Sequence, residues 1–306
     1  MIAGHSRRVK SSALRGQRIV SLSKRDFDNK LNAPGVTLPI FSSQDHATPS
    51  YTRSTTCWAK DIDLTCCSPW NSFGGDGAGG GPNQRAGTLI SPRHVIFASH
   101  YLVPGSNTIR FITMDNTVIT RTITSVVDLE GNASGLYMPD IAIGVLDTDV
   151  PIGITYATIL AEPWDKTLRG LLQLPAVVPP ITGKIWKYDY MNIPVLYLDQ
   201  EEKALVSEIS KISDVRNPGL DATHHYGAIE YKTSPSAVRQ LFFENVISGD
   251  SGNPAFLIIR NKPVLLSVWT SGGAGAGSFV NAWRSDINAA MTTLGGGYQL
   301  TSVSLK

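Results

Sequence analysis

Short runs of hydrophobic and β-branched residues, separated by turn-forming residues, make up most of the sequence after residue 86. Within residues 117–127 successive side chains alternate between two faces, with Val118, Thr120 and Thr122 on one of them. Such alternation is typical of a strand with one buried face. The same criteria predict strands at residues 87–91, 94–99, 108–113, 117–128, 141–146, 184–188, 195–199, 204–209, 240–243, 255–259, 264–269 and 277–280. The chain is therefore expected to be an all-β protein.

One amphipathic helix is predicted near the end of the sequence. Five apolar residues recur there at helical spacing and would share one face: Trp283, Ile287, Ala290, Met291 and Leu294. Asn281 is placed to cap the start of this helix, and Gly295 is placed to end it. We expect the helix to pack against the strands rather than to carry chemistry.

The strand series is interrupted once by a proline-rich stretch at residues 175–180. Proline removes backbone donors and resists strand pairing, so we expect a boundary between two lobes there. Residues 51–174 would form a first β-barrel, and residues 175–306 a second one with the helix. Residues 1–50 lack a sustained pattern and are expected to form a basic extension that is poorly ordered or wraps around the body.

Composition supports a globular protein and says little about a charged partner. The 306 residues are 42% hydrophobic and 17% charged, with a formal net charge of +2, which suits a sizeable core. Residues 1–30 hold eight basic and two acidic side chains, a local charge of +6. No aromatic residue interleaves these charges before Phe27, so we favour a solvated terminus over a nucleic-acid-binding arm.

Neither a metal nor a cofactor is expected. The three cysteines, Cys57, Cys66 and Cys67, are odd in number and lack paired zinc-ligand spacing. We interpret them as buried thiols, with one bridge from Cys57 to Cys66 or Cys67 as the alternative. The glycine-rich residues 71–83 lack the following Lys-Ser/Thr pair of a phosphate-binding loop. No apolar stretch is long enough for a transmembrane span, and none follows the first eight residues as a secretion signal requires.

Three separate segments could together support nucleophilic catalysis by a serine. A serine hydroxyl is a weak nucleophile and needs a base, a group that orients the base, and donors for the developing oxyanion. Ser251 lies between Gly249 and Gly252, in a segment suited to a tight turn. His100 follows a predicted strand, and Asp140 precedes another, where a buried carboxylate needs a partner.

These segments resemble the three signatures of the chymotrypsin/trypsin family of serine peptidases. Residues 249–254 (Gly-Asp-Ser-Gly-Asn-Pro) are similar to the family's Gly-Asp-Ser-Gly-Gly-Pro. Residues 87–100, which end in Ala-Ser-His, resemble its Gly-Ser-Leu-Ile to Ala-Ala-His segment, and residues 140–143 its Asp-Ile-Ala-Leu. The order His, Asp, Ser also matches, over roughly residues 85–294. The resemblance implies two packed six-stranded antiparallel β-barrels with a C-terminal α-helix.

The resemblance also implies roles for individual residues. Ser251 would be the nucleophile of a serine endopeptidase, His100 the general base and Asp140 the acid that orients it. The N–H groups of Gly249 and Ser251 would form the oxyanion hole. Substrate-binding residues are expected at the pocket base and its walls: Asn245, Thr270, Ser271, Gly272 and Gly277. A neutral Asn245 argues against a strict preference for Arg or Lys, and Thr270 is placed to hydrogen-bond Asp140.

Some positions depart from the family pattern. Asn253 replaces a glycine, Tyr101 replaces the cysteine after the histidine, and no convincing activation site precedes His100, which leaves the partner of Asp250 open. Two alternatives therefore stay beside the peptidase: a catalytically silent binding or structural module, and an esterase on the same scaffold. The expected partner is a protein or peptide substrate, and no nucleic acid is required. The resemblance implies an extracellular or periplasmic location, although no signal peptide is visible, and the oligomeric state is not predicted.

Overall fold

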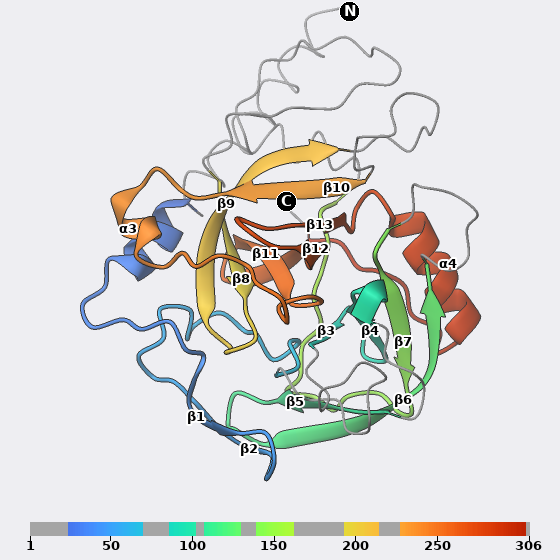
Figure 1. The fold of residues 1–306 in the computed structure, drawn as a ribbon. Helices are drawn as coiled ribbons and strands as arrows, with labels where there is room; N and C mark the ends of the chain where they lie inside the picture. The colour runs from blue at the N-terminus through green and yellow to red at the C-terminus, as the bar shows by residue number, and fades with distance from the viewer. Residues whose placement is uncertain are drawn as a thin grey trace, which may run out of the picture.

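The computed structural model of the chain describes residues 24–69, 86–101, 107–129, 139–161, 193–213 and 227–303. Within these residues the protein consists mainly of antiparallel strands, with a longer helix, α4, on one side of the molecule (Figure 1). No helix in this part of the chain is long and apolar enough to cross a membrane. The expectation of an all-β architecture with a six-stranded antiparallel barrel and a C-terminal helix is confirmed, with the differences given below.

The second half of the chain closes into a six-stranded barrel with the strand order β10-β13-β12-β11-β8-β9. The strands are β8 (Pro194–Leu198), β9 (Ala204–Ser213), β10 (Ala228–Lys232), β11 (Pro254–Ile259), β12 (Lys262–Ser271) and β13 (Ala276–Phe279). All six residues of β11 and all five of β8 are buried, because these neighbouring strands are covered on both faces. This explains why both read as continuous apolar runs rather than as alternating ones.

The first half forms a curled five-stranded sheet with the order β3-β4-β7-β6-β5. Its strands are β3 (Thr88–Leu89), β4 (His94–Phe97), β5 (Asn107–Ile112), β6 (Val118–Asp128) and β7 (Ala142–Leu146). A six-stranded barrel was expected here, and among the described residues the sheet has five strands. A short 3₁₀ helix, η1 (Ser99–Tyr101), follows β4, and β7 lies in the middle of the sheet.

Most predicted strands are present, but the one at residues 240–243 is wrong. The helix α3 (Ala237–Gln240) ends there in turns in which Leu241 N–H donates to Val238 and Phe242 N–H to Arg239. A short apolar run does not distinguish a strand from a turn that buries one aromatic ring, and Phe242 is that ring. Strand β10 was not predicted, and the predicted strand at residues 184–188 lies outside the described residues.

The predicted C-terminal helix is present as α4 (Arg284–Leu294). Gly295 ends it at a φ of 85°, as expected. Asn281 does not cap its start. Its side chain instead accepts the N–H of Leu160 at 3.1 Å and donates to the carbonyl of Leu160 at 2.8 Å, which fixes the end of the first half against the last helix.

Residues 24–69 lie against the body of the protein. Residues 24–31 are helical, and Phe27 packs on Trp58 with the ring centroids 4.9 Å apart. Trp58 donates its indole N–H to the carbonyl of Ala204 in β9 at 2.6 Å. A two-stranded hairpin, β1 (Phe41–Asp45) and β2 (Ser50–Arg53), follows the helix. Residues 1–23, the glycine-rich residues 71–83 and the predicted linker at 175–180 lie outside the described residues.

All three cysteines are buried free thiols, as the favoured interpretation had it. The Sγ atoms of Cys66 and Cys67 are 3.8 Å apart, and the alternative bridges from Cys57 are not formed. Burial raises the pKa of Cys57 to about 11, so this thiol stays protonated at neutral pH.

A buried ion cluster holds residues 24–31 to the second barrel. The guanidinium of Arg239 in α3 is 2% exposed and donates to both carboxylate oxygens of Asp28 at 2.8 and 2.9 Å. It also donates to Glu208 at 2.6 Å, and Glu208 is 1% exposed. The hydroxyl of Ser234 donates to the same Glu208 oxygen at 2.5 Å. Because burial makes each of these charges depend on the others, the cluster acts as one unit.

We expect Arg239→Met to lower the free energy of unfolding by about 3–5 kcal/mol, because it leaves the buried carboxylate of Glu208 without its cation. A matched control is Lys211→Met, which breaks the partly exposed pair with Glu230 and should cost less than about 1 kcal/mol. Denaturant unfolding of the three proteins measures both changes. Equal costs for the two substitutions would contradict a structural role for the buried cluster.

Candidate active site

The structure brings His100, Asp140 and Ser251 together, although they lie in three distant segments. His100 is in η1, directly after β4. Asp140 precedes β7, the strand that pairs with β4. Ser251 lies in a turn before β11 of the other half. Antiparallel pairing of β4 with β7 brings the histidine and the aspartate to the same end of these two strands, and the second barrel supplies the serine.

Hydrogen bonds join the three side chains in sequence. The Nδ1 atom of His100 is 2.6 Å from Oδ2 of Asp140, and its Nε2 atom is 2.8 Å from Oγ of Ser251. The backbone N–H of His100 also donates to Oδ1 of Asp140 at 2.8 Å. An ionised carboxylate at Nδ1 requires the proton on that nitrogen, so Nε2 is left as an acceptor facing the serine hydroxyl.

The surroundings of Asp140 keep it ionised. Its side chain is 12% exposed, and this burial by itself would raise its pKa. The hydrogen bonds from the His100 ring and backbone, the charge of His100 and a hydrogen bond with Thr270 outweigh the burial, and the pKa of Asp140 is lowered. The contact with Thr270 is the one expected from the sequence. The backbone N–H of Asp140 donates to Oγ of Ser278 at 3.0 Å, a contact that the sequence did not indicate.

The turn that carries Ser251 depends on glycine at two positions. Gly249 has a φ of 107°, in the region that favours glycine. Gly252 has a φ of 86°, and a Cβ atom there would lie 3.0 Å from the carbonyl oxygen of Ala86 and 3.4 Å from the nitrogen of Ala98. Ala86 and Ala98 belong to the first half of the chain, so the two halves lie in close contact beside the serine.

Asp250 holds the same turn in place, and the structure identifies its partners, which the sequence left open. The side chain is buried, and Oδ1 accepts the backbone N–H of Gln200 at 2.9 Å. Oδ2 accepts the backbone N–H of Ile247 at 2.8 Å, within the turn. Burial raises the pKa of Asp250, against the lowering by these two amides, and the nearby charges of Glu201 and Glu244 raise it further.

The expected substrate-binding residues fall into two groups in the structure. Asn245 is exposed and precedes Val246, which pairs with Gly273 through bonds of 2.8 and 3.0 Å. This bridge places the Asn245 segment beside the exposed residues Thr270, Ser271 and Gly272. Gly277 is different: it is buried in β13, where a Cβ atom would lie 2.0 Å from the carbonyl oxygen of Val268 in β12. Close packing of these strands therefore accounts for glycine at position 277.

Trp269 is a feature of this region that sequence reasoning missed. Its side chain is fully buried and makes edge contacts with Tyr197 and Tyr231, at centroid distances of 5.2 and 4.8 Å. A Cβ atom at Gly275 would lie 2.2 Å from the Trp269 ring, so this glycine gives the ring its space. The phenol of Tyr197 donates to the carbonyl of Glu244, next to Asn245. The aromatic cluster thus supports the Asn245 segment from inside the barrel.

Comparisons with known proteins give one similarity at the level of structure and none at the level of sequence. No family model matches the sequence, and no curated protein matches it. Among solved structures, the chain is similar to a mutant of human heparin binding protein (CAP37), with 12% sequence identity and a TM-score of 0.47. The match covers 77% of this chain and 95% of that one.

The carboxyl group of Asp199, beside the Ser251 turn, makes stability depend on pH. Burial raises its pKa to about 6 from an ordinary value of 3.8, against the amides of Lys203 and Glu201, and the charge of Asp250 adds to the rise. Between pH 4 and pH 6 the folded protein therefore holds a proton that the unfolded chain has lost. The stabilisation is complete below about pH 4 and is lost as the pH rises to about 6, with a total of at most about 3 kcal/mol.

We expect Asp199→Asn to remove this dependence and keep the local contacts. The amides of Glu201 and Lys203 both donate to Oδ1, which an asparagine oxygen can replace. The difference in unfolding free energy, wild type minus variant, should fall between pH 4 and pH 6 and stay level above pH 7. Denaturant unfolding across this range measures it, with the exposed Asp61→Asn as a control. A difference that rises over the same interval would contradict the assignment.

Proposed function

We propose that the protein is a serine endopeptidase that cleaves peptide bonds through an acyl-enzyme on Ser251. The observation that carries this proposal is the continuous hydrogen-bonded chain from Asp140 through His100 to Ser251, with distances of 2.6 and 2.8 Å. A serine, a histidine and a carboxylate held in this order supply a nucleophile, a base and a group that orients the base. The backbone N–H of His100 also donates to Asp140, and Asp250 holds the turn that carries Ser251.

In the first step Ser251 Oγ attacks the substrate carbonyl while His100 Nε2 takes its proton. The resulting imidazolium is stabilised by Asp140, which stays ionised because its pKa is lowered. His100 then gives this proton to the leaving amine, and the C–N bond breaks to leave the acyl group on Oγ. A water molecule repeats the sequence, with His100 as base, and releases the acid and the free serine.

The developing oxyanion would be held by the backbone N–H groups of Gly249 and Ser251. These residues flank Asp250, and the carboxylate of Asp250 ties the turn to Gln200 and Ile247. Donors fixed before the reaction stabilise the transition state without a cost of reorganisation. The positive φ of Gly249 supports this assignment, because other residues adopt that conformation rarely.

The substrate would lie along Asn245 and residues 270–272. The nearest carboxylate to Asn245 in sequence, Glu244, is paired with Lys203 at 2.9 Å and is therefore not available to a basic side chain of the substrate. A buried ammonium or guanidinium needs such a partner, so we infer that cleavage is not restricted to Arg or Lys. The reaction needs neither a metal nor a cofactor, since all groups that move protons belong to the chain.

We expect a fluorophosphonate probe to label the protein and Ser251→Ala to abolish the labelling, because phosphonylation requires the activated hydroxyl. Ser248→Ala is a matched control, since Ser248 is an exposed serine three residues away. Asp140→Asn should keep the serine but reduce peptide cleavage by roughly 10⁴-fold, because the histidine loses the group that fixes its tautomer. Intact-mass spectrometry and a peptide library measure both effects.

The same preparations separate the alternatives. Labelling that persists in Ser251→Ala would refute the assignment of the nucleophile. A wild-type protein that neither reacts with the probe nor cleaves peptides or esters would be the catalytically silent module. Turnover of esters without any peptide cleavage would make it an esterase, and cleavage only after Arg or Lys would contradict the inferred preference.

A further inference from the structure

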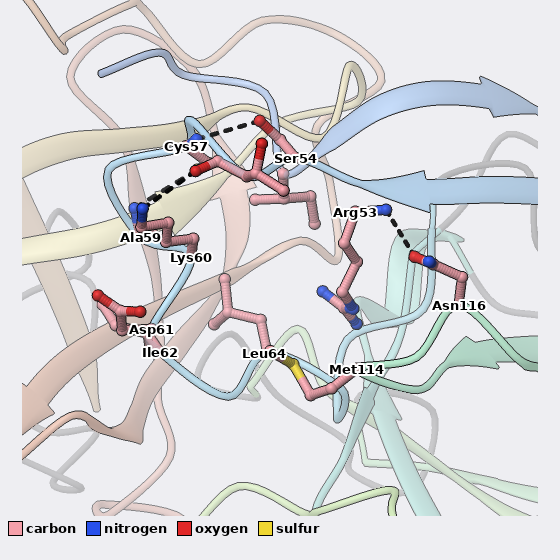
Figure 2. Close-up of a pocket in the computed structure, with 12 residues that line it drawn as sticks. Arg53, Ser54, Cys57, Ala59, Lys60, Asp61, Ile62, Leu64, Met114 and Asn116 are labelled. Carbon is pink, nitrogen blue, oxygen red and sulfur yellow. Dashed lines mark hydrogen bonds between the residues drawn. The ribbon is translucent and has the colours of Figure 1, made fainter. Parts of the chain in front are cut away.

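A second concave site lies in the first half of the chain, apart from the catalytic residues. It is a pocket of about 370 Å³ between the segment that follows β2 and the turn that joins β5 to β6. Figure 2 shows Arg53, Asn116 and Met114 on one side of it and Lys60 and Asp61 on the other. No residue proposed above to act in catalysis or in substrate binding lines it.

Arg53 is the most unusual residue of this pocket. Its Nε atom donates to the carbonyl of Thr113 at 2.9 Å, and Nη2 donates to the carbonyl of Ile112 at 2.5 Å. The ring of Phe41 covers one face of the guanidinium, 5.4 Å from its central carbon. None of these contacts uses Nη1, so the edge formed by Nη1 and Nη2 keeps donors that can bind a carboxylate with two parallel bonds.

Within the part of the chain that the structure describes, no carboxylate pairs directly with Arg53, although Asp63 is near enough for its charge to act on the guanidinium. Asp61 at the rim is paired with Lys30 at 3.4 Å, and Asp63 accepts its hydrogen bonds from Thr65. Burial lowers the pKa of Arg53, but a guanidinium stays charged at neutral pH. Arg53 is partly buried, and desolvation of a cation is costly unless charges or hydrogen bonds offset it. The pocket thus presents a guanidinium that has no directly bonded carboxylate.

About half of the remaining lining is apolar. Ile40, Ala59, Ile62, Leu64 and Met114 supply hydrocarbon surface, and Lys60 adds a second cation, whose ammonium donates to the carbonyl of Thr55 at 3.1 Å. Small-molecule sites typically combine an apolar lining with a few polar groups that fix orientation, in volumes of about 300–1,000 Å³. A ligand with an anionic head on Arg53 and a short hydrocarbon body against the apolar residues would match both the cationic and the apolar part of the lining.

We propose that this pocket is a binding site for a small aliphatic carboxylate, held through the free edge of the Arg53 guanidinium. The carboxylate would bond directly to the free edge of the guanidinium, and its alkyl chain would cover the apolar part of the wall. Arg53 also holds the β5–β6 turn in place, since its backbone N–H donates to Asn116 at 2.7 Å. A purely structural role of Arg53 needs no ligand, so saturable binding of a carboxylate distinguishes a binding role from a structural one.

The test uses hexanoate with the full chain labelled at its methionine methyl groups. The chain has five methionines, of which Met114 lines the pocket and is 49% exposed, whereas Met291 is buried in α4. Met114→Leu identifies the reporter signal. Hexanoate should shift the Met114 methyl signal in a saturable way and leave the Met291 signal in place. Hexan-1-ol, which has the same chain and no charge, should bind at least 10-fold more weakly.

Arg53→Gln should weaken hexanoate binding about 10–100-fold and leave hexan-1-ol unchanged, because only the charged head is affected. Lys60→Gln, at the rim, should change hexanoate binding less than 3-fold. The Met291 signal reports whether each variant is folded, and the hexanoate-to-hexanol comparison in the wild-type protein decides the question if Arg53→Gln is not. The proposal is overturned by the absence of a saturable shift, by equal binding of the alcohol, or by unchanged hexanoate binding in folded Arg53→Gln.

Discussion

Ser251 and His100 belong to different halves of the chain, and their hydrogen bond depends on how closely those halves approach. The approach is limited at Gly252, where even a single carbon atom would meet the Ala86 carbonyl at 3.0 Å. A side chain at this position would strain the turn, because the φ of Gly252 is 86°, and would press on the backbone of Ala86 close to the 2.8 Å hydrogen bond between His100 and Ser251. Glycine at position 252 thus allows the two halves to pack closely where the base meets the nucleophile.

Two carboxylates with different roles hold the histidine and the serine turn in place. Asp140 fixes the histidine from the first sheet, where several donors keep it ionised despite its burial. Asp250 fixes the serine turn from the second barrel through two backbone amides. One carboxylate therefore orients the base and the other shapes the turn that carries the nucleophile. Both sets of hydrogen bonds help to hold His100 and Ser251 at the 2.8 Å distance that joins them.

The sequence predicted the parts of this structure that depend on local pattern. Alternation and apolar runs located most strands of both sheets, and the motif glycines correctly indicated a turn that requires positive φ at Gly249. The hairpin β1–β2 was not predicted from the sequence. Each of its strands has a single buried residue, Phe41 in β1 and Tyr51 in β2, so no repeating pattern of buried residues exists there. The run Leu241 to Phe243 was misinterpreted because only one of its side chains, Phe242, is buried.

The contacts that complete the candidate site could not be predicted because they use groups that every residue has. Asp250 accepts the backbone N–H of Gln200, fifty residues earlier. Because nearly every residue has such an N–H group, the sequence does not indicate which one will be the partner. The same holds for the carbonyls that fix Arg53 and for the amide of Asp140 that reaches Ser278. Such partners are set by strand register and loop path, which follow from packing of the complete chain.

The central claim is that the hydrogen-bonded chain makes Ser251 a nucleophile that carries an acyl group. Acid quenching during turnover of a nitrophenyl ester, followed by peptide mapping, tests it most directly. The account predicts that the acyl group is found on Ser251 in the wild-type protein and in Ser248→Ala, and that it does not accumulate in His100→Ala. An acyl group on another residue, or equal acylation of Ser251 without His100, would contradict it.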